Sequence, residues 1–260
     1  MKRQLKFLVI TLILTIFAGS VQAADWSSTE LQFQYGRLDN PTFAGGGSTD
    51  TQIYTIQHAS GWKYGDNFFF VDFSMPENGG VDAYGELYSN FSLTKITGKD
   101  LSFGPVKDIG LLAGFNIGSD SNVKIYLPGI RFSWDIPGFA FLNSDFTAYI
   151  VDNPGAASGG APDEDNSFMV DINWAYPITT GFAKFSIEGH VEYVGERENE
   201  FNQDVDAWIL AQPQFRLDVG DLFGRPDTFF AGIEYQWWMN KLGDKNTDEN
   251  TVQALLVWRL

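Results

Sequence analysis

The sequence predicts an all-β fold, a transmembrane antiparallel up-and-down β-barrel of about twelve strands. Three observations support this class. Apolar and polar residues alternate with a period of two along most of residues 24–260, as in strands that face two different environments. Aromatic residues make up 16% of the chain, and they gather at the ends of the apolar faces, where bilayer interfaces would lie. Clusters of Gly, Pro, Asn and Asp separate the alternating segments, as turns require.

The first 23 residues have the features of an export signal. They open with three basic residues and no acidic one, and the apolar run at residues 7–18 is too short to span a bilayer of about 30 Å as a helix. A Val-Gln-Ala sequence then supplies small or apolar residues ahead of a cleavage site. We therefore expect residues 1–23 to be a cleaved signal peptide and residues 24–260 to form a barrel in the outer membrane of a Gram-negative cell.

The composition excludes several classes of function. With 33 acidic residues against 17 basic ones the formal charge is −16, and it becomes −19 once the three basic residues of the leader are removed. Such a chain lacks the basic surface that phosphate backbones require, so we expect no nucleic acid partner. A chain with no cysteine and two histidines excludes a Cys/His zinc site and a thiol nucleophile. We expect no metal and no cofactor.

Counting the alternating segments gives twelve strands, an even number that returns both chain ends to the periplasmic side. The expected strands are 27–37, 51–60, 67–75, 83–93, 107–117, 123–134, 139–151, 167–176, 182–194, 205–217, 227–238 and 250–260. The inward face of the second strand stays open, because apolar residues such as Ile53 and Ile56 occur on both of its faces. Hydrocarbon offers no partner to backbone amides, so the strands must close into a barrel without edges.

The connections between these strands alternate in character. Residues 135–138 and 177–181 are short turns. The other set is long and either acidic or rich in glycine, and it comprises residues 39–50, 153–166, 195–204 and 241–250. Short turns at one end and long loops at the other are typical of outer-membrane barrels. We expect the acidic loops to form a solvated surface, with cation-bridged contacts to lipopolysaccharide as the alternative.

The strand number also predicts the size of the lumen. A barrel of twelve strands lies between the small barrels that side chains fill and the porins of 16–18 strands that hold an open channel. We expect a narrow lumen that admits a single small solute.

Residues 94–108 carry a motif that alternating strands alone would not produce. They read Thr-Lys-Ile-Thr-Gly-Lys-Asp-Leu-Ser-Phe-Gly-Pro-Val-Lys-Asp. This stretch resembles a hallmark of the nucleoside-specific outer-membrane channel (Tsx/OmpK) family, in which "TGKDLSFGP" lies on a long periplasmic turn between strands four and five. The strand count places residues 99–105 on the same turn. The flanking residues 67–72 and 83–93 are also similar to the family's strands.

The resemblance implies a monomeric, non-catalytic channel whose lumen holds sites for nucleosides or similar small solutes. On this basis we expect facilitated diffusion of small hydrophilic solutes across the outer membrane, with outer-membrane lipid and lipopolysaccharide around the barrel. Some members of the family also serve as phage or colicin receptors through their outer loops. A barrel that acts mainly as such a receptor, or as a structural protein with a blocked lumen, is the alternative.

The alternation predicts which side chains line the lumen. Tyr84 and Glu86 lie at inward positions where the resemblance implies an aromatic residue and an acid. Phe68 and Phe70 also face inward, where a heterocyclic base could stack for about 1–3 kcal/mol per base, although the two rings could instead plug the barrel. The full set of candidate lining residues is Phe68, Phe70, Asp72, Tyr84, Glu86, Tyr88, Lys184, Glu188, Arg216 and Glu234. We expect Lys184 and Arg216 to pair with neighbouring acids.

An enzyme is the remaining alternative. His58 and Ser60 are two residues apart and therefore share one face of a strand, as in barrel phospholipases. Nucleophilic catalysis would also need a third group to orient the histidine ring, and none is evident beside them. The chain also lacks a Gly-x-Ser-x-Gly sequence, so we expect no catalytic residue.

Overall fold

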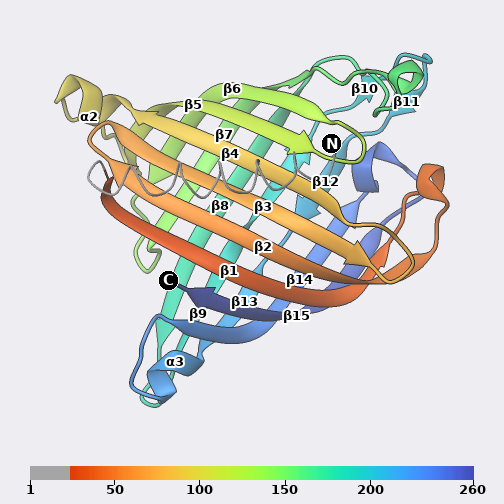
Figure 1. Ribbon diagram of the computed structural model, residues 1–260. Coiled ribbons are helices and arrows are strands. Elements are labelled where there is room, and N and C mark those ends of the chain that lie inside the picture. The colour runs from red at the N-terminus through yellow and green to blue at the C-terminus, as the bar shows by residue number, and fades with distance from the viewer. Residues whose placement is uncertain (1–23) are drawn as a thin grey trace, which may run out of the picture.

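The structure is a computed structural model that describes residues 24–260, and the predicted signal peptide at residues 1–23 lies outside the described part. One antiparallel sheet closes on itself (Figure 1). Its strands are β1 (Ala24–Asp39), β2 (Ser48–Trp62), β3 (Gly65–Pro76), β4 (Asp82–Ser92), β5 (Val106–Gly118), β6 (Lys124–Trp134), β7 (Phe141–Val151), β8 (Ser167–Thr179), β9 (Lys184–Val194), β12 (Trp208–Ala211), β13 (Gln214–Asp218), β14 (Phe229–Met239) and β15 (Glu249–Arg259).

Short elements occupy several connections. A small hairpin of β10 (Arg197–Glu198) and β11 (Asp204–Val205) lies within the predicted loop 195–204 and its flank. The helical elements are α2 (Leu93–Thr97), α3 (Val219–Leu222) and the 3-10 turns η1 (Thr42–Ala44), η2 (Ala156–Ser158) and η3 (Lys241–Gly243). Within residues 24–260 no helix has the length and apolar character needed to cross a membrane.

The first and last strands close the barrel. β1 pairs with β2 on one side and with β15 on the other, where Leu31 lies opposite Trp258 and Tyr35 lies opposite Ala254. Each strand of the sheet therefore has two neighbours and leaves no unpaired edge. The amide of Leu260 donates to the carbonyl oxygen of Thr29, which ties the C-terminus to the start of β1.

β12 and β13 are two halves of one strand, so the barrel has twelve strands, as the sequence predicts. Both halves pair with β9 and with β14. The prediction of an unbroken strand at residues 205–217 was wrong: the strand begins at Trp208 and is interrupted at Gln212 and Pro213. The interruption has a simple cause, because Pro213 has no amide hydrogen to donate to the ladder.

The end of the barrel where β1 begins and β15 ends also carries α2 and α3 (Figure 1). The predicted pattern of short turns at this end was only partly correct. Residues 93–105 and 219–228 form longer connections here, whereas residues 77–81 and 119–123 make short turns at the opposite end. Capped helices account for the longer connections: Ser92 Oγ accepts from the amide of Lys95 at 3.0 Å, and a carboxylate oxygen of Asp218 accepts from the amide of Asp221 at 2.9 Å.

Two smaller comparisons concern particular strands. β8 continues to Thr179, so the predicted turn at residues 177–181 lies two or three residues later, where the amide of Thr180 donates to Ala183 O. The open question about β2 is also resolved. Thr55 Oγ1 donates to Asp72 across the lumen wall at 2.5 Å, so the set containing Ile53 faces inward, and the set containing Ile56 faces outward.

The barrel reverses the usual distribution of polarity. Along β1, the inward side chain of Glu30 is 3% exposed, whereas its outward neighbour Leu31 is 38% exposed. The exposed apolar side chains of the other strands include Tyr54, Leu87, Leu111, Ile130, Phe146, Ile172, Phe215, Ile233, Leu256 and Trp258. A polar interior inside an apolar wall is the arrangement of a barrel that has hydrocarbon outside and water inside.

Candidate pore lining

One side of the lumen, on β3 and β4, combines aromatic rings with carboxylates. We call this set the aromatic–acid wall, and it comprises Phe68, Phe70, Asp72, Tyr84, Glu86 and Tyr88. The ring centroids of Phe68 and Phe70 are 6.2 Å apart, and those of Phe70 and Tyr84 are 6.3 Å apart. The rings alternate along each strand and meet across the strand pair, as expected for side chains on one face of a sheet. They provide a continuous aromatic surface inside the barrel.

Hydrogen bonds hold the carboxylates of this wall in place. Tyr84 Oη and Tyr88 Oη donate to the two carboxylate oxygens of Glu86 at 2.7 and 2.8 Å. Asn116 Nδ2 donates to Glu86 Oε1 at 3.1 Å and to Tyr84 Oη at 3.0 Å. These donors replace the water that a carboxylate loses on burial. Within residues 24–260 neither Glu86 nor Asp72 forms an ion pair, so uncharged hydroxyl and amide donors alone hold these two carboxyl groups in place.

Another part of the lumen wall, separated from β3 by β2, is a dense network of amides. We call it the glutamine wall, and it comprises Glu30, Gln32, Gln34, Gln214, Arg216, Glu234, Gln236 and Gln253 on β1, β13, β14 and β15. Gln34 Nε2 and Gln214 Nε2 both donate to Glu234 Oε2, at 2.9 and 2.6 Å. Gln253 Nε2 donates to Glu234 Oε1 at 3.0 Å. Glu234 is 3% exposed and is held by amides alone, without a cationic partner among the described residues.

Ion pairs anchor this wall. Arg216 Nη1 lies 3.1 Å from carboxylate oxygens of both Glu30 and Glu188, and Arg259 Nη2 lies 2.7 Å from Glu30. Lys184 Nζ lies 2.8 Å from Asp221, which α3 contributes. The predicted pairing of Lys184 and Arg216 with acids is therefore confirmed.

Nine of the ten predicted lining residues lie along the lumen wall, whereas Lys184 lies at the rim. Its side chain is 41% exposed, and its partner belongs to the connection between β13 and β14, at the end of the barrel where β1 begins. Sequence reasoning missed a further charged cluster, in which Arg131 forms two hydrogen bonds with Asp145 and one ion pair with Asp66 at 3.0 Å. The three residues come from β3, β6 and β7, so no local pattern could bring them together.

An apolar cluster inside the outer half of the barrel was also missed. Its buried members are Ile125, Leu127, Tyr149, Met169, Val194, Trp208 and Leu210. Both faces of β6 are apolar here, since Ile125 and Leu127 face inward while Tyr126 and Ile130 are exposed on the outside. Alternation cannot identify the inward face of such a strand.

Polar contacts join two loops at the outer end of the barrel. Lys241 Nζ lies 2.8 Å from the fully buried Glu249 and 5.2 Å from the ring of Trp238. Asp244, in the same loop, accepts hydrogen bonds from the amide and hydroxyl of Thr42 and from Thr247 Oγ1. Burial by itself would raise the pKa of Asp244, but these hydrogen bonds together hold its pKa well below the ordinary value. The loops at residues 40–47 and 240–248 are therefore joined at the mouth.

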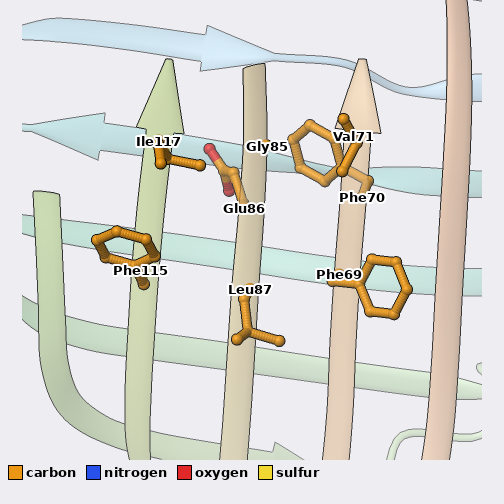
Figure 2. A pocket seen from close by; sticks show the side chains of 8 residues that line it. All are labelled: Phe69, Phe70, Val71, Gly85, Glu86, Leu87, Phe115 and Ile117. Carbon is orange, nitrogen blue, oxygen red and sulfur yellow. The ribbon is translucent and has the colours of Figure 1, made fainter. Parts of the chain in front are cut away.

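A hollow of about 270 Å³ lies over Gly85, where the missing side chain leaves space between β3, β4 and β5 (Figure 2). Its outward-pointing lining residues are Phe69, Val71, Leu87, Phe115 and Ile117, and Phe70 and Glu86 of the lumen wall complete it. The hollow is apolar and opens to the lipid-facing side. It therefore does not form part of a path for a hydrophilic solute.

The residues considered for catalysis also face outward. His58 stacks on Phe69 with ring centroids 5.4 Å apart, and its Nδ1 lies 2.8 Å from Thr29 Oγ1. A hydrolase triad would place an acid or amide at that nitrogen to orient the ring. Ser60 lies on the same outward face, two residues further along β2.

The chain resembles known outer-membrane channels in family and fold. The family model described as the nucleoside-specific channel-forming protein Tsx matches residues 22–257. No curated protein sequence matches the chain significantly. A solved structure of the NanC porin is 14% identical, with a TM-score of 0.52 over 88% of this chain and 100% of that one, and so shows the shared fold. The KdgM porin is 10% identical, with a TM-score of 0.47 over 88% of this chain and 98% of that one.

Proposed function

The chain belongs to the family of nucleoside-specific channel-forming proteins, and from this premise we propose that it conducts nucleosides across the outer membrane by facilitated diffusion. The family and the barrel fold support an outer-membrane channel. The observation that carries the nucleoside assignment is the aromatic–acid wall, in which Phe68, Phe70 and Tyr84 form a row of rings beside Glu86.

The wall matches the two halves of a nucleoside. A base can stack on an aromatic ring for about 1–3 kcal/mol by alanine substitution, and the contact tolerates different bases because every base has a π-face. Ribose hydroxyls need acceptors, which Asp72 and Glu86 supply. Weak binding at successive positions along the wall lets the solute be selected and then released, as conduction requires.

The charge of the lumen favours neutral solutes over anions. Asp72, Glu86 and Glu234 have no cationic partner among the described residues, as the ion pairs of residues 24–260 show. Lumen carboxylates without a cationic partner attract cations and repel anions when they are ionised. Phosphorylated nucleosides should therefore pass more slowly than nucleosides themselves.

Uptake into proteoliposomes tests the proposal. Adenosine should enter faster than a disaccharide of similar size that has no aromatic base. Phe70→Ala should remove most of this preference, whereas Phe69→Ala should keep it, because Phe69 is the neighbouring residue on the outward face (Figure 2). Equal uptake of the two solutes by the wild type would contradict nucleoside selection and leave a general porin.

The remaining assignments follow from the same premise. The chain should reach the outer membrane through cleavage after residue 23 and act as a monomer surrounded by lipopolysaccharide and lipid. N-terminal sequencing of the mature protein tests the cleavage, and a mature chain that begins before residue 20 would contradict it.

A further inference from the structure

We propose that Asp171, His190 and Glu192 bind a divalent transition-metal cation on the lumen wall. The ligand atoms of these three side chains, from β8 and β9, lie within 4.8 Å of one another. A mixed set of carboxylate oxygens and one imidazole nitrogen suits Zn²⁺ and similar ions. The inference departs from the expectation of no metal site, which rested on the scarcity of histidine and the absence of cysteine.

The strand register makes this cluster costly without a cation. Asp171 and Glu192 lie directly opposite each other on neighbouring strands and face the same side. Like charges in that position destabilise a sheet, and burial strengthens the repulsion. Both residues are buried, at 7% and 6% exposure. A divalent cation between the two carboxylates would turn this repulsion into attraction.

The carboxylate of Glu192 is the second observation that points to a ligand. Among residues 24–260 it forms neither a hydrogen bond nor an ion pair, although more than nine-tenths of the side chain is buried. Buried carboxylates normally have partners. By contrast, Glu188 lies on the same face of β9 and pairs with Arg216. The carboxylate of Glu192 is therefore directed into the cluster with no protein partner to satisfy it.

The hydrogen bonds of His190 orient its ring for coordination. His190 Nε2 lies 2.9 Å from Gln212 Oε1, and the side-chain nitrogen Nε2 of Gln212 donates to Gln236 Oε1 at 2.9 Å. This chain of bonds places the oxygen of Gln212 against the ring, so Nε2 carries the hydrogen. Histidines that bind a metal ion through one ring nitrogen donate the N–H of the other ring nitrogen to an oxygen in the same way.

The other ring nitrogen then faces a carboxylate. His190 Nδ1 lies 3.1 Å from Asp171 Oδ2, and Asn173 Nδ2 orients Asp171 by donating to its Oδ1 at 2.6 Å. A lone pair on Nδ1 would repel Asp171 unless a cation or a second proton lies beside it. The metal site and a doubly protonated ring are therefore the two competing explanations of this geometry.

Calorimetric titration of the folded, chelator-treated barrel with ZnCl₂ near neutral pH distinguishes them. The wild type should take up one zinc ion per barrel, and Glu192→Gln and His190→Gln should each weaken binding by about tenfold or more. Asp66→Asn is the matched control, since Asp66 is another lumen acid that pairs with Arg131 outside the cluster. It should bind zinc like the wild type.

Two results would overturn the site. A wild type that takes up no zinc would show that a proton fills the gap at His190. Zinc binding that is equal in the wild type and in both cluster variants would place the ion elsewhere, for example on the acidic loops. A gel shift on boiling, measured for every variant, confirms that each barrel is folded, and neither result depends on whether nucleosides are the solute.

Discussion

The two walls of the lumen solve the problem of burying polar groups in different ways. In the glutamine wall, Glu234 accepts from four glutamine side chains and Arg216 pairs with two acids. The aromatic–acid wall combines ring faces with two acids that accept from hydroxyl and amide donors and form no ion pair among the described residues. From this comparison we expect the first wall to hold the barrel together and the second to contact the solute. Substitutions in the first should affect stability, and substitutions in the second should affect transport.

The largest expected effect is on the stability provided by the glutamine wall. Arg216→Ala leaves Glu188 without its cationic partner and removes one of the two that Glu30 has. Removing one partner of a buried ion pair costs about 3–5 kcal/mol. Urea unfolding of the barrel in detergent micelles, followed by intrinsic tryptophan fluorescence, measures it. A loss below about 1 kcal/mol would mean that this wall does not stabilise the barrel.

A smaller effect, on transport rather than on folding, is expected from Glu86→Gln in the aromatic–acid wall. The variant loses the negative charge and one of the two acceptors that Tyr84 and Tyr88 use. A hydrogen bond from a ribose hydroxyl to a charged carboxylate contributes about 1.5–3 kcal/mol. Its loss should therefore lower the affinity for adenosine roughly tenfold or more. The reversal potential in a KCl gradient should also shift toward lower cation selectivity. Unchanged affinity and selectivity together would show that solutes do not meet Glu86.

Loss of the hydrogen bonds between the loops at residues 40–47 and 240–248 should have a local effect. The lowered pKa of Asp244 means that its hydrogen bonds stabilise the fold above the ordinary aspartate pKa of about 4, and that this contribution is lost only as the pH falls through the lower folded-state pKa. The loop 240–248 should therefore resist proteolysis equally at pH values from neutral down to about 5. Asp244→Asn should make it sensitive throughout that range. A wild-type loop that becomes sensitive between neutral pH and about 5 would contradict this assignment.

The smallest effect is expected at the lipid-facing hollow. A Cβ atom added at Gly85 would lie 3.1 Å from the carbonyl oxygen of Phe70 and 3.3 Å from Val71 Cγ2, so small shifts suffice to accept it. Gly85→Ala should change stability by less than about 1 kcal/mol and leave conductance unchanged. A clear fall in adenosine affinity in this variant would show that the hollow communicates with the lumen, against the separation of the two faces.

Much of the fold could be predicted because each strand has lipid on one face and the polar lumen on the other. Apolar and polar residues therefore alternate along its sequence. The strand at residues 83–93, for instance, has one inward and one outward set and was assigned correctly at both ends to within a residue. The interruption at Pro213 was missed because the strand resumes directly after the proline, so the segment was predicted as one unbroken strand. Lys184 was assigned to the lining only because side chains alternate between the two faces of a strand. This alternation does not indicate how far along the barrel axis a side chain lies.

The contacts within the lumen were harder to predict. Arg216 and Glu30 are 186 positions apart and meet only because the barrel closes. The cluster of Asp171, His190 and Glu192 depends on the register between β8 and β9, where a shift of one residue would turn Asp171 away from the other two. The register between two strands is set by the whole sheet and cannot be deduced from the sequence of one strand.

Titration of single-channel current with adenosine tests the central claim most directly. The purified wild-type barrel in a planar bilayer should conduct ions, and its current should fall in a saturable way as adenosine occupies the aromatic–acid wall. A current that stays constant up to millimolar adenosine would contradict nucleoside binding in the lumen, and a barrel that carries no current at all would contradict the channel itself.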